Sequence, residues 1–434
     1  MKLREYQLRL IEQTVEILWT KRVAYLTLET RVGKTPVSLV SAERYFARHH
    51  DQIREVLFCT KKGIIPAIEK TAKELRDSGL FTADLTVMSF DSLHHVSWKS
   101  GRILIIDEAH SFGSYPQPSK RATQLRALTE LVPVILLSAT PTPESYSQIF
   151  HQLWACHCDI FMKYKSFYHW ANVFVDIREK KINKFDYVKD FSKAKWELIK
   201  PLLDQITISY TQEEAGFNHT EVTITTIPCP MPPYLRDLIQ PFRRVVRKGE
   251  DAVPEKITVE FDGKKISADS PAARMSKVHQ LCSGTVINDD GEGMIVSTHK
   301  IPMLDKILHS YGKIAIYYKF VAELELLTTF YGDRLTSDAH RFEESNGLIY
   351  VGQFQSKREG IDLKSAKAIV FYNIDHAYLS YEQTKNRMQS IDRATPPELV
   401  LLMSEKGIEE KIFKVVSKKK NYTAAHYLRQ ECLF

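Results

Sequence analysis

The sequence predicts an α/β protein made of two parallel-sheet domains, with helical and partly basic insertions between them. Two observations support this fold class. Short apolar runs alternate with helix-like segments over the first 155 residues, and the same alternation returns near residue 313. Strands that alternate with helices form βαβ units, whose strands lie parallel in one sheet.

The first domain is expected at residues 1–155. Its candidate strands are the apolar runs 23–28, 55–60, 85–90, 102–108 and 133–140. Each run is rich in β-branched or aromatic residues and is bounded by turn-forming or charged residues, as is typical of buried parallel strands. Helix-like segments, such as 35–48 and 64–77, lie between these runs.

Residues 156–220 change in character to lysine-rich and aromatic-rich sequence, which we interpret as a helical insertion or linker. Its aromatic residues Trp170, Phe174 and Trp196 fit an amphipathic bundle in which they are buried. The alternative is that the segment forms a wedge or a protrusion.

The second domain is expected to start within 221–300, where the strand-like run 220–228 is followed by an inserted segment. Residues 236–292 carry charges of both signs and Gly-Lys or Asp-Gly turns, which favour an insertion over sheet. The main part of the domain is then 301–434. Its candidate strands are 313–318, 347–354, 367–373 and 398–403.

Composition sets limits on the function. The chain has 434 residues, of which 44% are hydrophobic and 26% are charged, which excludes a disordered, collagen-like or coiled-coil protein. The net charge of +7 permits nucleic acid as a partner without demanding it. The six cysteines lack paired spacing, the N-terminus is charged, and no apolar run reaches about 18 residues. We therefore expect a reduced, intracellular, cytoplasmic protein without a membrane segment.

A candidate phosphate-binding loop follows the run 23–28. Gly33 lets the backbone approach phosphate groups, and the amides of the following helix point at them. Lys34 would hold the β- and γ-phosphates of ATP, and the hydroxyl of Thr35 would bind Mg²⁺.

The loop departs from the full GxxxxGKT pattern, because Leu28 stands where the first glycine belongs. Arg31 occupies a position where a small residue is common, and we include Arg31 and Val32 among the nucleotide contacts. The alternative from this segment alone is a Gly-Lys-Thr turn that arises by chance.

A pair of acids follows the run 103–106, in the sequence ILIIDEAH of residues 103–110. Asp107 would bind the Mg²⁺ ion, directly or through water, and Glu108 would orient or deprotonate the attacking water. The alternatives are a helix N-terminus with two capping acids and a zinc site built on His110. The order of the loop and the acids, as in the Walker A and Walker B motifs, favours ATP binding.

Other potential metal ligands are weaker candidates. His151, Cys156, His157 and Cys158 match no closed four-ligand zinc spacing. Cys282 fits core packing better than the role of a nucleophile.

The motifs together resemble the superfamily 2 helicases, which are DEAH-containing nucleic-acid motors. Within that superfamily the sequence is similar to Swi/Snf-type translocases and their small phage-encoded relatives. The matching segments, in chain order, are 3–7, 29–35, 58–62, 88–93, 105–110, 136–143, 277–284, 313–327, 354–363 and 383–393. The resemblance implies two RecA-like domains with ATP and Mg²⁺ bound at their interface.

In the first domain, the resemblance implies that Gln7 reads the edge of the adenine ring. Ser138 and Thr140 would link hydrolysis to movement. The residues whose loops face nucleic acid in this family are Lys61, Lys62 and Ser89, and Lys357 in the second domain.

In the second domain, Gly360 and Asp362 match the fifth helicase motif, and Gln383 and Arg387 match the sixth. We assign all but Arg387 to nucleotide binding, and Arg387 to the arginine finger that stabilises the transferring phosphoryl group. The next arginine of the sixth motif is replaced by Ser390 in this chain. Arg393, one helical turn later, is a candidate substitute.

The resemblance implies an ATP-dependent DNA helicase or translocase that remodels forks or branched DNA by unwinding or branch migration. Its partner would be single-stranded, forked or branched DNA bound without sequence preference, and it would act as a monomer. For a phage-encoded protein, this activity would serve replication, recombination or repair in the host cytoplasm. The alternatives are a DNA-binding protein with a decayed ATPase, a duplex translocase without strand separation, a small-molecule P-loop kinase and an RNA motor.

Overall fold

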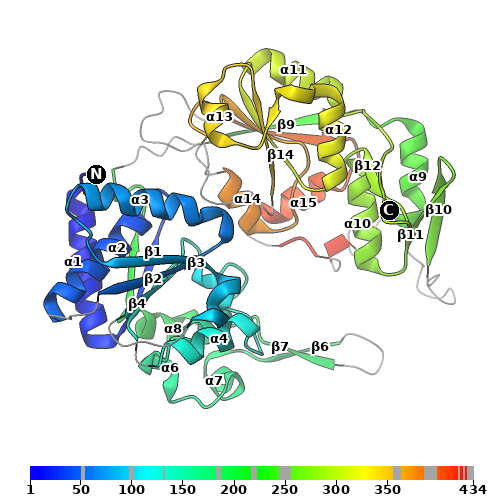
Figure 1. The fold of residues 1–434 in the computed structure, drawn as a ribbon. Helices are drawn as coiled ribbons and strands as arrows, with labels where there is room; N and C mark the ends of the chain where they lie inside the picture. The colour runs from blue at the N-terminus through cyan, green and yellow to red at the C-terminus, as the bar shows by residue number, and fades with distance from the viewer. Residues whose placement is uncertain are drawn as a thin grey trace. The chain divides into compact units, whose positions relative to one another are not determined.

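The computed structural model describes residues 1–49, 54–96, 102–130, 132–181, 187–216, 222–243, 256–354, 363–385, 398–418, 421–423 and 426–427. Its contacts divide the chain into two units, Met1–His219 and Thr220–Phe434. Each unit contains one six-stranded sheet whose neighbouring strands are all parallel (Figure 1). The predicted α/β fold class with two parallel-sheet domains is confirmed.

The sheet of unit 1 contains the strands that the apolar runs predict. In spatial order its strands are β3 (Asp84–Ser89), β2 (Glu55–Thr60), β4 (Arg102–Ile106), β5 (Val134–Leu137), β1 (Val23–Leu28) and β8 (Thr207–Tyr210). The carboxyl ends of parallel strands meet at the same edge of a sheet. The loops after β1, β2, β3, β4 and β5 therefore share one edge.

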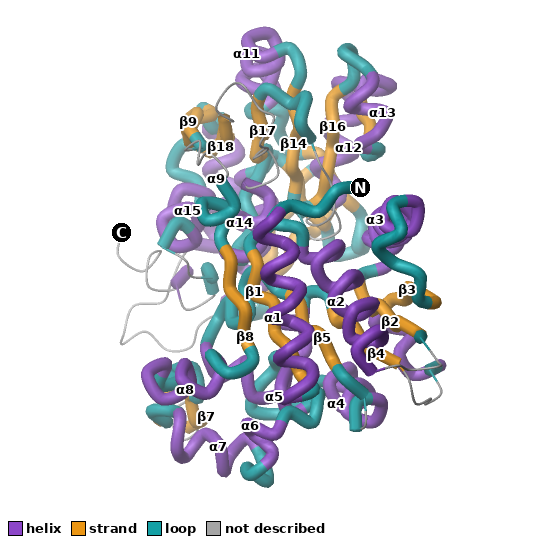
Figure 2. Tube along the Cα trace, turned by 90° about the vertical axis from the view of Figure 1, so that its left-hand side faces the viewer, coloured by secondary structure: helices purple, strands orange, loops and turns teal. Residues whose placement is uncertain are grey.

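Helices cover both faces of this sheet, because successive strand residues point to opposite sides. Ala24 and Leu26 of β1 pack into one core, while Val23 and Tyr25 pack into the other. The first core is closed by α1 (Glu5–Lys21), α2 (Lys34–His49) and α3 (Ile65–Asp77). The second is closed by α4 (Lys120–Leu128), α5 (Ile149–Trp154), α6 (Asp159–Met162), α7 (Phe167–Phe174) and α8 (Trp196–Leu203). Figure 2 shows α1 running beside β1 and β8.

The segment 156–220 differs in part from its helical prediction. Besides α6 to α8 it forms an antiparallel hairpin, β6 (Arg178–Lys181) with β7 (Tyr187–Asp190), which extends away from α7 (Figure 1). It also supplies β8, because the backbone of Thr207–Tyr210 pairs in parallel with the outer edge of β1. Trp170 and Phe174 are buried as expected, and the half-buried Trp196 stacks on Tyr146.

The sheet of unit 2 repeats the same design. In spatial order its strands are β15 (Leu335–Thr336), β16 (Ile349–Gln353), β14 (Ile314–Tyr318), β17 (Ala368–Phe371), β18 (Glu398–Ser404) and β9 (Thr223–Cys229). One face packs on α11 (Ile301–Tyr311) and α12 (Val321–Tyr331). The other packs on α9 (Pro233–Arg243), α10 (Pro271–Cys282), α13 (Ala339–Glu344), α14 (Tyr378–Lys385) and α15 (Glu409–Val416).

The sequence predicts that residues 236–292 form an insertion rather than sheet, and the structure corrects this prediction. The segment forms part of α9, all of α10 and two small antiparallel pairs, β10 (Ile257–Phe261) with β11 (Lys264–Ala268) and β12 (Thr285–Ile287) with β13 (Gly293–Ile295), the last strand ending just beyond it. Phe242, Ile266 and Val278 are fully buried in the core of unit 2. The segment is therefore part of the domain core, since its apolar residues cover one face of the sheet.

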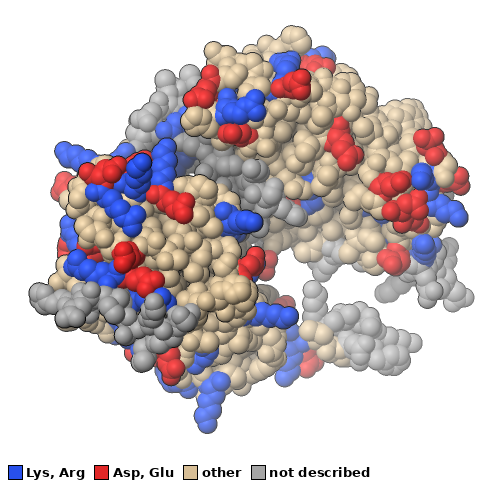
Figure 3. All heavy atoms as spheres, viewed as in Figure 1, with Lys and Arg blue, Asp and Glu red and all other residues tan. Residues whose placement is uncertain are grey.

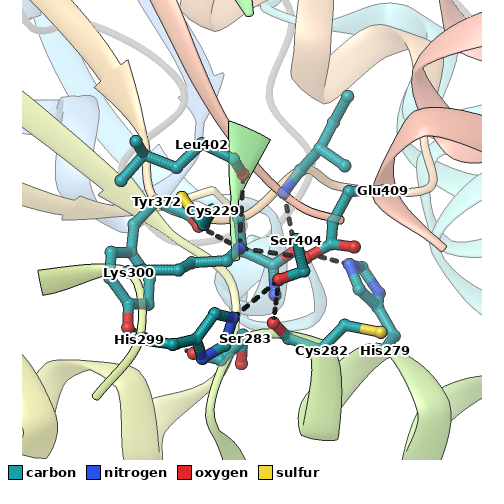
Figure 4. A network of polar contacts seen from close by, with 12 residues as sticks. Cys229, His279, Cys282, Ser283, His299, Lys300, Tyr372, Leu402, Ser404 and Glu409 are labelled. Carbon is teal, nitrogen blue, oxygen red and sulfur yellow. Dashed lines mark hydrogen bonds and ion pairs between the residues drawn. The ribbon is translucent and has the colours of Figure 1, made fainter. Parts of the chain in front are cut away.

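A buried ion pair joins helices and strands of unit 2 (Figure 4). Lys300 and Glu409 are 0% and 1% exposed, and Nζ of Lys300 lies 3.0 Å from Oε1 of Glu409. The same ammonium donates to the carbonyl oxygens of Tyr372 at 2.8 Å and Leu402 at 3.2 Å. These three acceptors use all three ammonium protons, so the buried charge is fully hydrogen-bonded.

Replacing Lys300 with methionine is expected to destabilise unit 2 by about 3–5 kcal/mol, because it leaves the Glu409 carboxylate buried without its counter-charge. The double variant Lys300→Met/Glu409→Leu should recover most of this loss. Urea unfolding followed by circular dichroism measures both. A double variant less stable than the single one would contradict this reading of the pair.

The cysteines of the described residues are buried. Cys59, Cys156 and Cys158 lie in unit 1, and Cys229 and Cys282 lie in unit 2. Burial raises the pKa of Cys59 and Cys282 to about 12, and that of Cys158 and Cys229 to about 11. These thiols are therefore protonated at neutral pH. Within the described ranges, no helix combines the length and apolar character that crossing a membrane requires.

Candidate functional site

The predicted phosphate loop lies between β1 and α2, as the sequence indicates. Lys34 is the first residue of α2, and Gly33 before it has a φ of +102°. Nζ of Lys34 donates to the carbonyl oxygens of Leu28 at 3.2 Å and Glu29 at 3.5 Å. The loop therefore folds around the lysine side chain, while Thr35 occupies the second position of the helix.

Helix α1 holds this loop from outside. The hydroxyl of Tyr6 and the side-chain amide of Gln7 donate to the carbonyl oxygen of Val32, at 3.0 and 3.1 Å. The other end of Gln7 accepts a hydrogen bond from the backbone N–H of Arg4 at 2.9 Å. Gln7 is thus placed against the phosphate loop, which is a contact the sequence did not specify.

The two acids follow β4 at the same edge of the sheet. The hydroxyl of Thr60, at the end of β2, donates to Oδ2 of Asp107 at 2.9 Å. The backbone N–H of Glu108 donates to Oδ1 of Asp107 at 3.1 Å, and Glu108 itself has a left-handed φ of +47°. Asp107 is therefore fixed at both oxygens. Thr60 is a site residue that the sequence analysis missed, although it belongs to the segment 58–62.

Glu108 is connected to the predicted third motif through His110. Nδ1 of His110 lies 3.1 Å from Oε2 of Glu108 and 3.1 Å from Oγ of Ser138, which follows β5. Oγ of Ser138 in turn accepts the backbone N–H of Thr140 at 3.1 Å. His110 therefore contacts Glu108 and Ser138, and this polar contact is the role that the structure gives it in place of the zinc ligand considered above.

The electrostatic surroundings favour the ionised form of Glu108. Burial alone would raise the pKa of its carboxyl group. The hydrogen bond and charge of His110, together with the positive charges of Lys34 and Lys61, outweigh burial and hold the pKa below its ordinary value of 4.5. Glu108 is therefore a carboxylate at neutral pH and is able to accept a proton.

The predicted DNA-contacting residues of unit 1 lie on the same edge. Lys61 directly follows β2, the exposed Lys62 starts a 3₁₀ helix at Lys62–Ile64, and Ser89 ends β3. Ser89 Oγ lies 3.1 Å from Oγ of Ser92. The structure therefore brings these three residues to the edge that carries the phosphate loop and the acids.

The donor set fits Mg²⁺. Thr35 and Asp107 offer hydroxyl and carboxylate oxygens, which are the hard ligands that this ion prefers. Among the described residues there is no group of three or more His, Cys, Asp or Glu arranged for a metal ion. Magnesium sites of ATPases use one or two protein ligands and complete the shell with phosphates and water.

Most of the predicted site in unit 2 lies outside the described residues, namely Lys357, Gly360, Asp362, Arg387 and the candidate substitute Arg393. Gln383 is described and belongs to α14, where its Oε1 is buried without a hydrogen-bond partner among the described residues.

Unit 2 also contains a polar cluster that the sequence analysis missed. Lys319, directly after β14, forms an ion pair with Asp375, and Asn373 donates to Glu323. Burial and the charge of Lys319 lower the pKa of the neighbouring His376 to about 3, so this ring is neutral. The cluster fixes the loop that leads from β17 into α14, and hence toward Gln383. Its only signal in the sequence is the position of polar residues directly after apolar runs.

Residues 41–149 match the family model described as DEAD/DEAH box helicase. The match includes the acids after β4 and the residues after β2, β3 and β5. Over these residues the chain is similar to DEAD/DEAH box helicases. The resemblance to superfamily 2 helicases is confirmed, whereas a phage origin stays a prediction. Because the match begins at Ser41, after the phosphate loop, the assignment of residues 29–35 rests on their own geometry.

Three solved structures are similar to this chain. The Hef helicase domain of Pyrococcus furiosus shares 10% identity at a TM-score of 0.51, over 96% of this chain and 98% of that chain. The SWI2/SNF2 ATPase core of Sulfolobus solfataricus in complex with dsDNA shares 15% identity at 0.41, over 100% and 95%. The same core domain alone shares 14% at 0.40, over 96% and 89%. A comparison with curated protein sequences gives no match.

Replacing Gly33 with alanine is expected to weaken nucleotide binding by at least about tenfold. An added Cβ would lie 2.2 Å from Nε2 of Gln7, and the φ of +102° is unfavourable for any L side chain. Gly79→Ala is the matched control, because Gly79 also has a positive φ, +69°, but open space around its Cβ position. Titration with a fluorescent ATP analogue should show a loss in Gly33→Ala only. Equal affinities would contradict the assigned loop.

Proposed function

We propose that this chain is an ATP-driven DNA helicase or translocase. The observation that carries the proposal is the shared edge of one parallel sheet, where the phosphate loop with Lys34 meets Asp107 and Glu108. Ligands of open α/β sheets bind at the carboxyl ends of the strands, where these residues lie. The match of residues 41–149 to DEAD/DEAH box helicases supports ATP hydrolysis as the reaction.

The proposed roles follow from the contacts in unit 1. Lys34 binds the β- and γ-phosphates, and the amides of residues 31–35 surround them at the start of α2. Thr35 and Asp107 hold Mg²⁺, whose charge offsets that of the phosphates. Glu108, ionised and oriented by His110, accepts a proton from the attacking water.

We propose further that Gln7 contacts the adenine base when ATP is bound. Its side chain donates to the carbonyl oxygen of Val32 in the phosphate loop, which supports a contact with a nucleotide bound at that loop. This contact would make binding depend on the base as well as on the phosphates.

Unit 2 is proposed to supply the remaining nucleotide contacts through Gly360, Asp362 and Gln383, and the arginine finger through Arg387. A guanidinium that stabilises the transferring phosphoryl group contributes about 10³–10⁵ in rate where it has been measured. Binding of ATP would then close the two units, and hydrolysis would reopen them.

The proposed track is DNA, contacted by Lys61, Lys62, Ser89 and Lys357. Figure 3 shows Lys and Arg interspersed with Asp and Glu on the visible face, rather than gathered into one basic patch. Binding through these loop residues would rest on phosphate contacts, which carry no sequence information. Movement along single-stranded, forked or branched DNA by a monomer would be observed as unwinding or branch migration.

Steady-state ATP hydrolysis tests the proposal. The full chain is assayed alone and with single strands, blunt duplex, forks, four-way junctions and RNA, with Lys34→Ala as the control. We expect strong stimulation by at least one DNA form and none in the variant.

The other outcomes separate the alternatives. Flat, low hydrolysis with intact DNA binding would mean that the ATPase has decayed, and hydrolysis that ignores nucleic acid would favour a small-molecule kinase. Stimulation by RNA alone would replace DNA as the track. Stimulation by blunt duplex without strand separation in an unwinding assay would favour a duplex translocase.

A further inference from the structure

The turn that follows β8 is hydrogen-bonded to the phosphate loop. The backbone N–H of Gln212 donates to Oε2 of Glu29 at 2.8 Å. Its side-chain amide donates to the carbonyl oxygen of Thr30 at 2.8 Å and to the Thr30 hydroxyl at 3.2 Å. Gln212 is only 5% exposed, so these bonds are shielded from water.

Neighbouring residues extend the same contact. The carbonyl oxygen of Tyr210 accepts the backbone N–H of Glu29 at 3.0 Å. The ring of Tyr210 stacks on Tyr6 with centroids 5.1 Å apart, and the hydroxyl of Tyr6 donates to Val32 at 3.0 Å. The phosphate loop is thus held from one side by α1 and from the other by the end of β8 and its turn.

This loop needs support from outside because its own sequence does not favour its shape. Leu28 replaces the first glycine of the usual pattern, and Arg31 adopts a left-handed φ of +67°. A left-handed backbone costs an L residue about 1–2 kcal/mol. Strained conformations at functional sites persist only where surrounding contacts determine them, and Gln212 supplies three such contacts.

The position of Gln212 in the chain points to a second role for this contact. The turn at 211–216 is the last described segment before unit 2, which begins at Thr220. The residues that hold the phosphate loop therefore lie shortly before the start of unit 2 in the chain. A change in the loop on nucleotide binding would therefore alter the hydrogen bonds of the turn at 211–216.

We propose that Gln212 is a positioning residue that couples occupancy of the phosphate loop to the turn at 211–216, which precedes unit 2 in the chain. The proposal rests on ATP binding at Lys34. Coupling is reciprocal: if the Gln212 contacts favour nucleotide binding, bound nucleotide strengthens the Gln212 contacts by the same factor.

Two measurements on the full chain test this coupling. The first is the affinity for a fluorescent ATP analogue. The second is hydrogen exchange of the peptide covering 205–216, with and without a non-hydrolysable ATP analogue and Mg²⁺. The exchange of the Gln212 amide reports its bond to Glu29 directly.

The variants remove the contact from each end. Gln212→Ala removes the side-chain bonds to Thr30, and Glu29→Ala removes the acceptor of the Gln212 N–H. Glu29→Gln keeps an acceptor oxygen and serves as the rescue variant. Glu213→Gln is the matched control, because Glu213 is exposed in the same turn.

We expect Gln212→Ala and Glu29→Ala to bind the analogue about tenfold more weakly, Glu29→Gln to bind more tightly than Glu29→Ala, and Glu213→Gln to bind within about twofold of the unmodified chain. Nucleotide should slow exchange of 205–216 by at least about fivefold in the unmodified chain and not in Gln212→Ala. A merely structural contact would lower thermal stability without removing this nucleotide response. If Gln212→Ala fails to fold, Glu29→Ala carries the same test.

Two results would overturn the proposal. One is unchanged affinity in both alanine variants. The other is exchange of 205–216 that ignores a nucleotide which the unmodified chain binds. If the unmodified chain binds no nucleotide, ATP binding at Lys34 itself is wrong, and this result is distinguishable from the other two.

Discussion

Replacing Lys34 with alanine is expected to lower ATP hydrolysis by about 10²–10³-fold, because the variant loses the ammonium group that stabilises charge on the transferring phosphoryl group. The fold should survive, since Nζ of Lys34 contacts only the two carbonyl oxygens of Leu28 and Glu29 among the described residues. Hydrolysis is measured by phosphate release with saturating DNA, and thermal unfolding checks the fold.

Lys70→Ala provides the control for this loss of a lysine. Lys70 is an exposed residue of α3, so its removal changes the net charge by the same amount without touching the site. Hydrolysis that survives in Lys34→Ala would mean that ATP is bound elsewhere in the chain. Equal losses in both variants would point to net charge instead.

Replacing Glu108 with glutamine is expected to lower hydrolysis by about 10²–10⁴-fold while ATP binding stays within about twofold. The amide has nearly the shape of the carboxylate but cannot accept a proton from the attacking water. Because the pKa of Glu108 lies below 4.5, the carboxylate is ionised throughout the range in which such enzymes are assayed. Its own protonation should therefore not limit the rate at neutral pH.

Single-turnover hydrolysis and analogue titration separate the two effects in Glu108→Gln. Glu69→Gln, at an exposed position of α3, is the matched control and should behave like the unmodified chain. Loss of binding together with hydrolysis would assign Glu108 to the magnesium shell. Normal hydrolysis would remove it from the reaction.

The strands and the main site were predictable because buried parallel strands are continuous apolar runs with functional residues directly after them. Strands β1 and β2 have the predicted bounds, and the acids follow β4 in the order that the sequence indicates. The motifs around Gly33 and Asp107 are short and contiguous. One local pattern therefore locates each of them without knowledge of the fold.

The contacts of Gln212 and Lys300 could not be predicted in the same way. Gln212 bonds to Thr30, 182 positions earlier, and Lys300 bonds to Glu409, 109 positions later. Such partners are set by strand order, which periodicity does not reveal. The prediction for residues 236–292 was wrong for a related reason. Their turns and charges resemble a surface insertion, although Phe242 and Val278 pack in the core of unit 2.

Because the cysteines of the described residues are buried, their rate of reaction with a thiol reagent reports local opening of the core. A thiol reagent reacts with the thiolate, which these protonated side chains form only when the surrounding core is exposed to water. Opening of unit 1 would be reported by Cys59, Cys156 and Cys158. Opening of unit 2 would be reported by Cys229 and Cys282. Once Cys432, outside the described residues, is replaced by serine, labelling rates read by mass spectrometry would show whether nucleotide protects one half of the molecule or both.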